Sequence, residues 1–240
     1  MAGMIHFAIG DVHGESTKLH ALHDAILDRI AFERLPARII HLGDYVDRGP
    51  DSRGVIERVM ALEALFAGST TIEVISLLGN HEQMMLDAYD AQGDAGNWWS
   101  QGGAEAADSY AGGSGLADAN WRETIPREHI TWLRNLPRMY RDQARRLVFV
   151  HAGIDPRRFP DCPESIHLWT RSDKFFDHAQ WPDREEVRDL RVIHGHTPKS
   201  HLPEVFLHRI NVDTGAVFGG PLTAVMLKDD EEPLFLRAGG

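Results

Sequence analysis

The chain has 240 residues, a length that suits one sizeable α/β domain with a substantial buried core. Its net charge of −11 argues against extended binding to a nucleic-acid backbone, which requires a basic face. A small phosphorylated substrate remains compatible with this charge, because bound metals and a few arginines can reverse its sign locally.

The sequence also bears on the compartment in which the chain works. It contains no run of about eighteen apolar residues, so we expect no membrane span. The first six residues, MAGMIH, lack the basic start and long apolar core of a secretory signal. The single cysteine, Cys162, excludes an internal disulfide framework and fits a reducing compartment. We therefore expect a cytoplasmic protein.

The first third of the chain alternates apolar runs with amphipathic segments. Strands are expected at residues 4–9, 38–42 and 70–78. Apolar residues at helical spacing predict helices at residues 16–30, 51–66 and 83–91. Ser16 or Thr17 is expected to cap the first of these helices. The first strand, the first helix and the second strand together form a βαβ unit of ordinary length.

Residues 92–124 differ in composition, with many glycines and with Trp98, Trp99 and Trp121. The segment is too long for an ordinary connection. It fits a lid or a substrate wall built with aromatic residues, and it fits equally well a helical insertion that packs its tryptophans on the core. Both interpretations stay open.

The second half of the chain indicates mainly strands. A helix is expected at residues 127–136, ended by Pro137. Strands are expected at residues 146–150, 191–193, 205–212, 222–227 and 234–236, with a polar segment at 159–188. The pattern predicts an α/β fold of two packed mixed β-sheets flanked by helices, a four-layer sandwich, in a single domain covering residues 1–240.

Polar residues follow the carboxyl ends of several expected strands. The relevant stretches are GDVHG at 10–14, GDYVDRG at 43–49, GNHE at 79–82, HAG at 151–153, HGHTP at 194–198 and DTG at 213–215. Loops at the carboxyl ends of strands are the usual place for a site in an α/β sheet. One such stretch alone would suit a turn, since Asp, Asn and Gly are common turn residues. Their recurrence predicts a shared site.

The strand ends supply oxygen and imidazole donors without a thiolate: Asp11, His13, Asp44, Asn80, His151 and His196. Such a set suits Mn²⁺, Fe or Zn²⁺ and argues against an iron–sulfur cluster or a structural Cys-zinc site. Six donors exceed the needs of one tetrahedral ion, so we predict two divalent metal ions that share a bridging carboxylate. Two such ions, about 3.5–4 Å apart, would activate a water and polarise a phosphoryl oxygen together.

Other histidines are interpreted as structural or solvated. His20 and His23 have the i, i+3 spacing of a metal pair, but no carboxylate or cysteine accompanies them. His194, next to His196, is assigned to structure. Neither interpretation adds a metal ligand.

Three of these glycine-bounded motifs resemble those of a known family. GDVHG, GDYVDRG and GNHE match the GDxHG…GDxVDRG…GNHE signature of the phosphoprotein-phosphatase branch of the calcineurin-like metallophosphoesterases. The match resembles the small phage and bacterial serine/threonine phosphatases in particular, and residues 79–85 and 213–218 are similar to them beyond the metal motifs. The resemblance covers nearly the whole chain, with the motifs in the right order and spacing.

The resemblance implies a role for each metal donor. Asp11, His13 and Asp44 would hold the first ion. The second ion would be held by Asp44, Asn80, His151 and His196, with Asp44 as the bridge. Mn²⁺ is the expected metal, with Fe or Zn²⁺ as alternatives, and a hydroxide between the two ions would attack phosphorus in line without a covalent phosphoenzyme.

The same resemblance implies the other catalytic residues. His81 would be the general acid that protonates the leaving alkoxide, and Asp47 would orient it. Arg48 and Arg171 would clamp the phosphate, with Asn80 contributing. Arg171 lies in a weakly patterned stretch, so Arg157 or Arg158 could take its place.

The resemblance leaves the substrate less defined than the chemistry. We expect a protein serine/threonine phosphatase acting on a phosphorylated protein or a small phosphoester, with a symmetrical bis(5′-nucleosyl)-tetraphosphatase as the alternative. Tetraphosphatases tend to lack the Asp before the Arg of the second motif and to carry Asp after GNH, so Asp47 and Glu82 favour the phosphatase. The middle segment matches poorly, and Trp99–Gly103 has Gln101 where the family pattern has Asn. A non-catalytic phosphate-binding protein and a nuclease fit the ligand set and the acidic charge less well.

Overall fold

The computed structural model describes residues 3–90, 95–113, 120–229 and 231–240. Its strands are β1 (Ile5–Ile9), β2 (Ala37–His41), β3 (Ile72–Ser76), β4 (Met139–Asp142), β5 (Leu147–Val150), β6 (Arg191–His194), β7 (Glu204–Val205), β8 (Arg209–Asn211), β9 (Leu222–Leu227) and β10 (Leu234–Ala238). Its helices are α1 (Ser16–Glu33), α2 (Ser52–Phe66), α3 (Asn80–Tyr89), α4 (Ala95–Trp98), α5 (Ala104–Tyr110), α6 (Trp121–Thr124), α7 (Arg127–Asn135), α8 (Glu164–Trp169) and α9 (Asp173–Phe176). Short helical turns are η1 (Trp99–Gly103), η2 (His178–Gln180) and η3 (Ala216–Phe218).

The described strands form two mixed sheets, as the sequence predicts. The first has the order β10-β9-β1-β2-β3, in which β1, β2 and β3 run parallel and β9 and β10 are antiparallel. The second has the order β4-β5-β6-β8-β7, with β5, β6 and β8 parallel and an antiparallel strand at each edge. In each sheet the parallel strands therefore bring their carboxyl ends to one edge.

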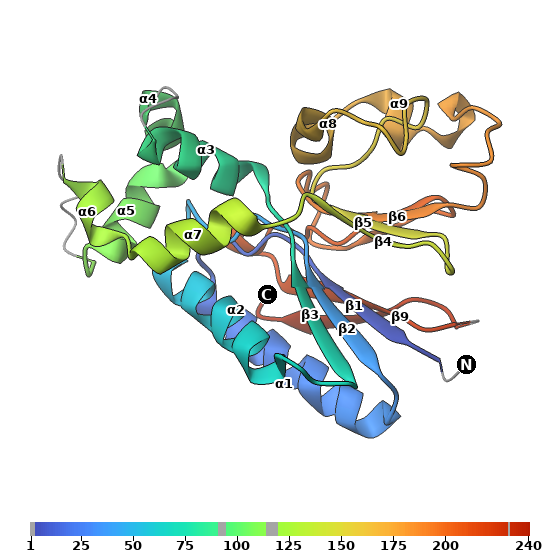
Figure 1. Ribbon diagram of the computed structural model, residues 1–240, viewed down its shortest axis with the longest axis horizontal. Coiled ribbons are helices and arrows are strands. Elements are labelled where there is room, and N and C mark those ends of the chain that lie inside the picture. The colour runs from blue at the N-terminus through green and yellow to red at the C-terminus, as the bar shows by residue number, and fades with distance from the viewer. Residues whose placement is uncertain (1–2, 91–94, 114–119, 230) are drawn as a thin grey trace.

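The two sheets lie face to face with helices outside them (Figure 1). Helices α1 and α2 cover the outer face of the first sheet, and the segment with α8 and α9 lies over the second. Apolar residues alternate along β1 accordingly: Phe7 packs in the cluster with the helices, and Ala8 packs in the cluster between the sheets. A third cluster, around Phe159 and Phe175, fills the space under the α8–α9 segment.

A side-chain cap starts α2 as predicted, whereas the predicted cap of α1 is absent. The Asp51 side chain accepts a hydrogen bond from the Gly54 N–H at 2.9 Å and starts α2, as its sequence indicates. Helix α1 begins at Ser16 itself, preceded by Glu15 without a side-chain cap, so capping by Ser16 or Thr17 is wrong.

Two further expectations are wrong in their bounds. Residues 205–212 are not one strand, because the chain turns back after Val205 and the N–H of Phe206 donates to the carbonyl of Arg209, which makes β7 and β8 an antiparallel pair. Helix α3 begins at Asn80 rather than Gln83, because the Glu82 carboxylate accepts the Gly79 N–H at 2.9 Å and caps the first turn. Strand β4 was not expected from the sequence.

The described part of residues 92–124 is helical. Helices α4, α5 and α6 pack beside α3 and α7 (Figure 1), and Trp98 and Trp121 are buried in the core cluster. Residues 92–94 and 114–119 lie outside the described residues. The helical-insertion interpretation fits the part that is described.

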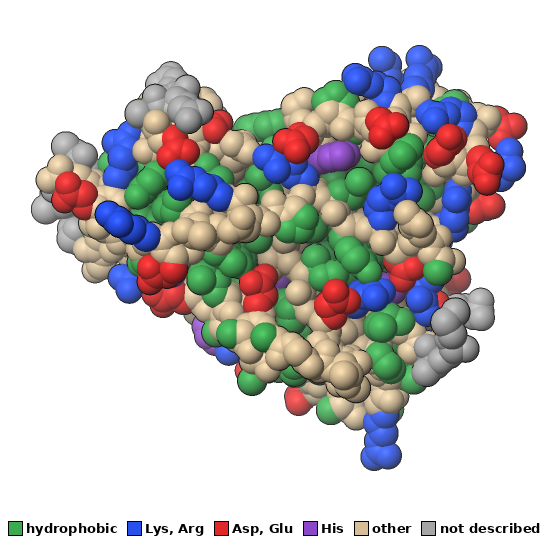
Figure 2. All heavy atoms as spheres, viewed as in Figure 1, with side chains coloured by type: hydrophobic (Ala, Val, Ile, Leu, Met, Phe, Trp, Pro, Cys, Tyr) green, Lys and Arg blue, Asp and Glu red, His purple; other side chains and the backbone are tan. Residues whose placement is uncertain are grey.

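The outer surface carries mixed charge. On the face drawn in Figure 2, Lys and Arg side chains lie among Asp and Glu side chains, and the outline dips between the part with α3 and α4 and the part with α8 and α9. Among the described residues, no helix combines the length and the apolar character that crossing a membrane requires.

The core makes a direct stability prediction. Phe7 is fully buried at the centre of β1, whereas Phe32 on α1 is 76% exposed. Phe7→Ala should lower the free energy of unfolding by about 3–5 kcal/mol, because it removes buried area and leaves a cavity. Phe32→Ala is the matched control and should change it by about 0.5 kcal/mol or less. Urea unfolding of both variants measures the difference, and equal small losses would contradict this packing.

Candidate metal centre

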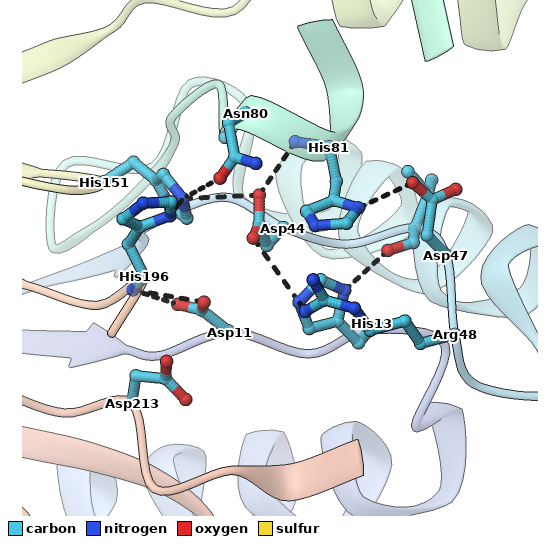
Figure 3. A network of polar contacts seen from close by, with 12 residues as sticks. Asp11, His13, Asp44, Asp47, Arg48, Asn80, His81, His151, His196 and Asp213 are labelled. Atoms are coloured by element: carbon cyan, nitrogen blue, oxygen red, sulfur yellow. Dashed lines mark hydrogen bonds and ion pairs between the residues drawn. The ribbon is translucent and has the colours of Figure 1, made fainter. Parts of the chain in front are cut away.

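The site is built from loops that follow the parallel strands of both sheets. Asp11 and His13 follow β1, Asp44 follows β2, and Asn80 and His81 open α3 directly after β3. His151 follows β5 and His196 follows β6, in the second sheet. Figure 3 shows these side chains pointing toward one another around Asp44. The two sheets thus face each other across the group of donors that the sequence predicts.

The backbone at this place is strained. Eight described residues other than glycine have a left-handed backbone, and five of them are predicted site residues: His13 (φ 45°), Asp44 (φ 55°), Asp47 (φ 74°), Arg48 (φ 67°) and His196 (φ 69°). Each such conformation costs on the order of 1 kcal/mol or more, and the surrounding structure must hold it. Backbone strain of this kind is common at active sites and ligand-binding sites.

Two groups of donors share Asp44. The first is His13, Asp44 and His81, and the second is Asp44, His151 and His196; within each group the donor atoms lie within 4.8 Å of one another. His and Asp side chains are therefore positioned to bind metal ions. The Asp44 carboxylate is central, with Oδ2 3.4 Å from His13 Nε2 and Oδ1 3.3 Å from His151 Nε2.

Hydrogen bonds orient the imidazoles. Nδ1 of His13 lies 2.8 Å from the Val46 carbonyl, and Nδ1 of His151 lies 3.0 Å from the Leu42 carbonyl. These carbonyls accept from protonated Nδ1 atoms, which leaves each Nε2 lone pair directed at the site. His151 Nε2 also lies 2.8 Å from Asn80 Oδ1, so the asparagine oxygen points at the same place.

Asp11 lies beside these two groups rather than in them. Both of its carboxylate oxygens are 3.1 Å from the backbone N–H of His196, which donates to them. Asp213, from the DTG stretch, is buried next to Asp11, and its proximity helps raise the pKa of Asp11. No role for Asp213 was predicted from the sequence, because only the fold brings the ends of β1 and β8 together.

The charges of the described residues fit a bound cation. Burial raises the pKa of Asp11 and Asp44 well above the usual range, and it lowers the pKa of His13 and His151 to about 3 and that of His196 to about 2. Neutral imidazoles are the form that ligates metal, and His196 Nε2 is buried without a hydrogen-bond partner in the described part of the chain. Carboxylates crowded together with free imidazole lone pairs are a site in which a divalent ion would supply the missing positive charge.

His81 and Asp47 form a buried pair beside the metal donors. His81 Nδ1 lies 2.7 Å from Asp47 Oδ2, which leaves Nε2 as the second nitrogen of the ring. Burial holds the pKa of His81 far below its ordinary value, with His13 and Arg48 adding to the effect, and burial raises the pKa of Asp47. The loops after β2 and β3 bring the pair together.

Glu82 holds the loop that carries Asp44 and Asp47. Its two carboxylate oxygens accept four backbone N–H groups: Asp44 at 2.8 Å, Tyr45 at 2.7 Å, Val46 at 3.1 Å and Gly79 at 2.9 Å. The side chain is fully buried. Charge-assisted bonds of this kind are stronger than neutral ones, so Glu82 fixes the loop against α3. From the sequence alone, Glu82 serves only to favour a phosphatase over a tetraphosphatase.

A hollow of about 280 Å³ opens next to the donors. Its lining includes residues from the donor set, both predicted arginines and residues of the 92–124 segment: Asp44, Arg48, Asn80, His81, Met84, Asn97, Gln101, Trp169, Arg171 and His196. Arg157 and Arg158, the alternatives to Arg171, do not line it. Gln101, which departs from the family pattern, stands in its wall.

A larger hollow of about 660 Å³ lies away from these donors, at the start of β1. His6, Arg145 and Lys228 line it, and acidic neighbours pair the two cations: Arg145 with Asp229 and Lys228 with Glu231. Some of the predicted metal donors and both predicted arginines line the smaller hollow instead.

The remaining histidines have other partners. His23 Nε2 contacts His41 Nε2 at 2.9 Å, and His20 contacts its own helix at the Ser16 carbonyl. His194 is buried against Phe175. These contacts agree with the interpretation of His20, His23 and His194 as residues outside the site.

A model of the calcineurin-like phosphoesterase family matches residues 7–231. The chain belongs to this family. The family resemblance and the fold inferred from the sequence are thereby confirmed.

Relatives within the family carry two different names. A symmetrical bis(5′-nucleosyl)-tetraphosphatase of Chromohalobacter salexigens is 33% identical over 153 residues, which cover 64% of this chain and 46% of that protein. Serine/threonine-protein phosphatase 1 of Salmonella typhimurium is 28% identical over 230 residues, which cover 92% of this chain and 91% of that protein. The chain thus matches less than half the length of the first relative.

Solved structures support the fold. A crystal structure provisionally assigned as a diadenosine tetraphosphatase matches 99% of this calcineurin-like phosphoesterase and 99% of its own chain, with a TM-score of 0.65 and 20% identity. At this identity the likeness shows the arrangement of the sheets and leaves the substrate open.

The position of Glu82 leads to a second prediction. Glu82→Ala would leave four buried backbone donors without their acceptor, so the free energy of unfolding should fall by about 3 kcal/mol or more. Glu57→Ala, which removes an exposed ion pair with Arg53, is the control and should cost less than about 1 kcal/mol. Thermal and urea unfolding measure both, and a loss as small as that of the control would contradict the anchoring role.

Proposed function

We propose that this chain is a dinuclear-metal phosphomonoesterase, and that its substrates are phosphoserine and phosphothreonine side chains of proteins. The observation that carries the proposal is the carboxylate of Asp44, shared by two donor groups, with His81, held by Asp47, lining the same hollow. A phosphoester placed there would meet metal ligands on one side and a proton donor on the other.

We assign two divalent ions, Mn²⁺ first and Fe or Zn²⁺ as alternatives, to six ligands: Asp11, His13, Asp44, Asn80, His151 and His196. When bound, such ions activate a water and stabilise negative charge on the phosphoryl oxygens. The chain's own contribution is to hold neutral imidazoles and carboxylates at fixed directions, through the Val46 and Leu42 carbonyls and the Glu82 anchor.

His81 is the general acid in this proposal. Its Nδ1 is held by Asp47, so Nε2 would give a proton to the oxygen that leaves phosphorus. A serine alkoxide is a poor leaving group, and a positioned acid accelerates its departure by about 10²–10⁴-fold. A phosphate dianion beside the ring would favour the charged imidazole that burial alone disfavours.

Arg48 and Arg171 are the phosphate clamp. Both line the hollow, and planar guanidinium groups suit bidentate contact with phosphate oxygens. Arg48 Nη1 lies 2.7 Å from His13 Nε2, so the guanidinium places positive charge where a cation would be held. An ion on His13 would free Arg48 to bind substrate.

Several observations bear on the substrate. Asp47 and Glu82 fit the family pattern of phosphatases. Asp47 contacts the His81 ring, and an uncharged side chain at position 47 would lose this contact. Glu82 accepts a backbone hydrogen bond from Tyr45 that the shorter Asp of the tetraphosphatase pattern would lose. The hollow of about 280 Å³ is slightly smaller than the roughly 300–1,000 Å³ of pockets that enclose drug-sized ligands. It suits one phosphorylated side chain, whereas much of a dinucleoside tetraphosphate would lie outside.

A symmetrical bis(5′-nucleosyl)-tetraphosphatase is the second candidate. The observation in its favour is the identity of about one third to relatives of that name. The same metal ligands and the same acid would serve either reaction.

Steady-state assays decide between the two. With Mn²⁺ present, the protein should hydrolyse a phosphoserine peptide and an aryl phosphate with a higher kcat/KM than diadenosine tetraphosphate. His81→Asn should lower kcat on the peptide by about 10²–10⁴-fold, while His20→Asn, an exposed histidine, should leave it unchanged. Faster turnover of the dinucleotide would replace the substrate assignment, and no turnover of any phosphoester would overturn the enzyme proposal.

Metal content tests the bridging role. Asp44→Asn should cost more bound metal than Asp11→Asn, because Asp44 belongs to both donor groups and Asp11 to neither. Elemental analysis after dialysis against Mn²⁺ should give clearly less than two ions per chain for Asp44→Asn, with Asp11→Asn closer to wild type. Equal and full metal content in the two variants would contradict a shared Asp44.

A further inference from the structure

Trp98 makes a contact that the family motifs do not account for. It ends α4 and is 1% exposed. Its indole Nε1–H donates to both carboxylate oxygens of Asp47, at 3.0 Å to Oδ1 and 3.1 Å to Oδ2. A residue of the 92–124 segment therefore reaches the carboxylate that holds His81.

This contact completes the surroundings of the Asp47 side chain. Oδ2 faces His81 Nδ1, and the Asp47 backbone N–H donates to Ser52 Oγ at 3.0 Å. Among the described residues, the indole of Trp98 is the only group that donates to Oδ1. Without it, the carboxylate could rotate and take the His81 ring with it, because one hydrogen bond fixes distance but not orientation.

The indole is itself held firmly. Its ring packs against Trp121 with centroids 4.6 Å apart, and a side chain at Gly103 would come within 2.4 Å of it. The same segment also contacts the loop after β2 that carries Asp47 and Arg48: the Arg48 N–H donates to the Gly102 carbonyl at 3.0 Å. Gly102 has φ 106°, which brings the two backbones together. The segment is thus docked on both Asp47 and Arg48.

We propose that Trp98 is a positioning residue for proton donation by His81: it fixes Asp47 so that His81 Nε2 points at the leaving oxygen. The inference rests on the proposed phosphomonoesterase function. In the reaction, the oxygen of water forms a new bond to phosphorus and the bond to the leaving oxygen breaks. That oxygen takes the proton of His81 Nε2, and the proton lost by water restores the imidazolium, giving an alcohol and phosphate.

The leaving group provides the test. A serine leaves as a poor alkoxide and depends on the acid, whereas 4-nitrophenolate leaves well without one. Trp98→Phe keeps the aromatic bulk and removes the N–H. It should lower kcat on a phosphoserine peptide by about 10–100-fold, part of the whole effect of general-acid catalysis, and lower kcat on 4-nitrophenyl phosphate by less than about 3-fold. KM and bound metal should stay at the wild-type values.

Two variants serve as controls. Trp99→Phe changes the neighbouring tryptophan, which packs on Trp98 with centroids 5.5 Å apart, and should leave both substrates unaffected. Trp98→Phe in a His81→Asn background should cause no further loss on the peptide, because the acid through which Trp98 acts is gone. Equal losses on both substrates, or an additive loss in the double variant, would show a merely structural role and overturn the inference.

A readout without turnover separates this inference from the proposed function. In wild-type protein the Trp98 Nε1–H resonance, assigned through its loss in Trp98→Phe, should shift in Asp47→Asn while the other indole resonances stay in place. The His81 ring resonances should shift in Trp98→Phe. Unchanged resonances would overturn the positioning role even in an active enzyme, and their shift would support it even if no phosphoester tested is a substrate.

Discussion

The arrangement of the site depends on one buried carboxylate that accepts hydrogen bonds from the backbone. Glu82 accepts N–H groups from three consecutive residues of the β2 loop and from the residue that precedes α3. These bonds allow Asp44 to adopt a left-handed backbone and to point at His13 and His151 at once. They also set the start of α3, and with it the directions of Asn80 and His81. Two loops from different strands thereby become one rigid unit.

The charge balance of the site follows from this rigidity. Acidic side chains are buried close together, with Arg48 as a cation near them. Burial of like charges opposes folding, so the arrangement lowers stability and strongly favours a bound cation. Arg48, turned toward His13, offsets part of this charge in the described structure.

Much of this could be predicted from the sequence, because the informative signals are local. Apolar runs of strand length located β1, β2 and β3, and the glycine-bounded motifs after them placed Asp11, Asp44 and Asn80 at a shared edge. The break between β7 and β8 could not be seen, because residues 205–212 are mostly apolar, contain no glycine or proline, and turn back through a backbone bond from Phe206 to Arg209. The apolar pattern alone cannot distinguish one long strand from a tight pair.

Long-range contacts account for the other omissions. Trp98 lies 51 residues from Asp47, and the composition around it leaves a lid and a helical insertion open without indicating an indole donor. Asp213 reaches Asp11 from the far end of the chain. Such pairs exist only in the folded chain, so composition and spacing indicate candidate donors but do not indicate the contacts of Trp98 and Asp213.

The donors come from two separate sheets, and this has a mechanical consequence. His13 and Asp44 belong to loops of the first sheet, and His151 and His196 belong to loops of the second. An ion held by both sets would act as a clasp between the two halves of the sandwich. Because such an ion binds only the closed arrangement, the free energy that resists separation of the sheets would rise with the logarithm of the metal concentration. The mechanical cohesion of the molecule would then follow the supply of metal in its surroundings.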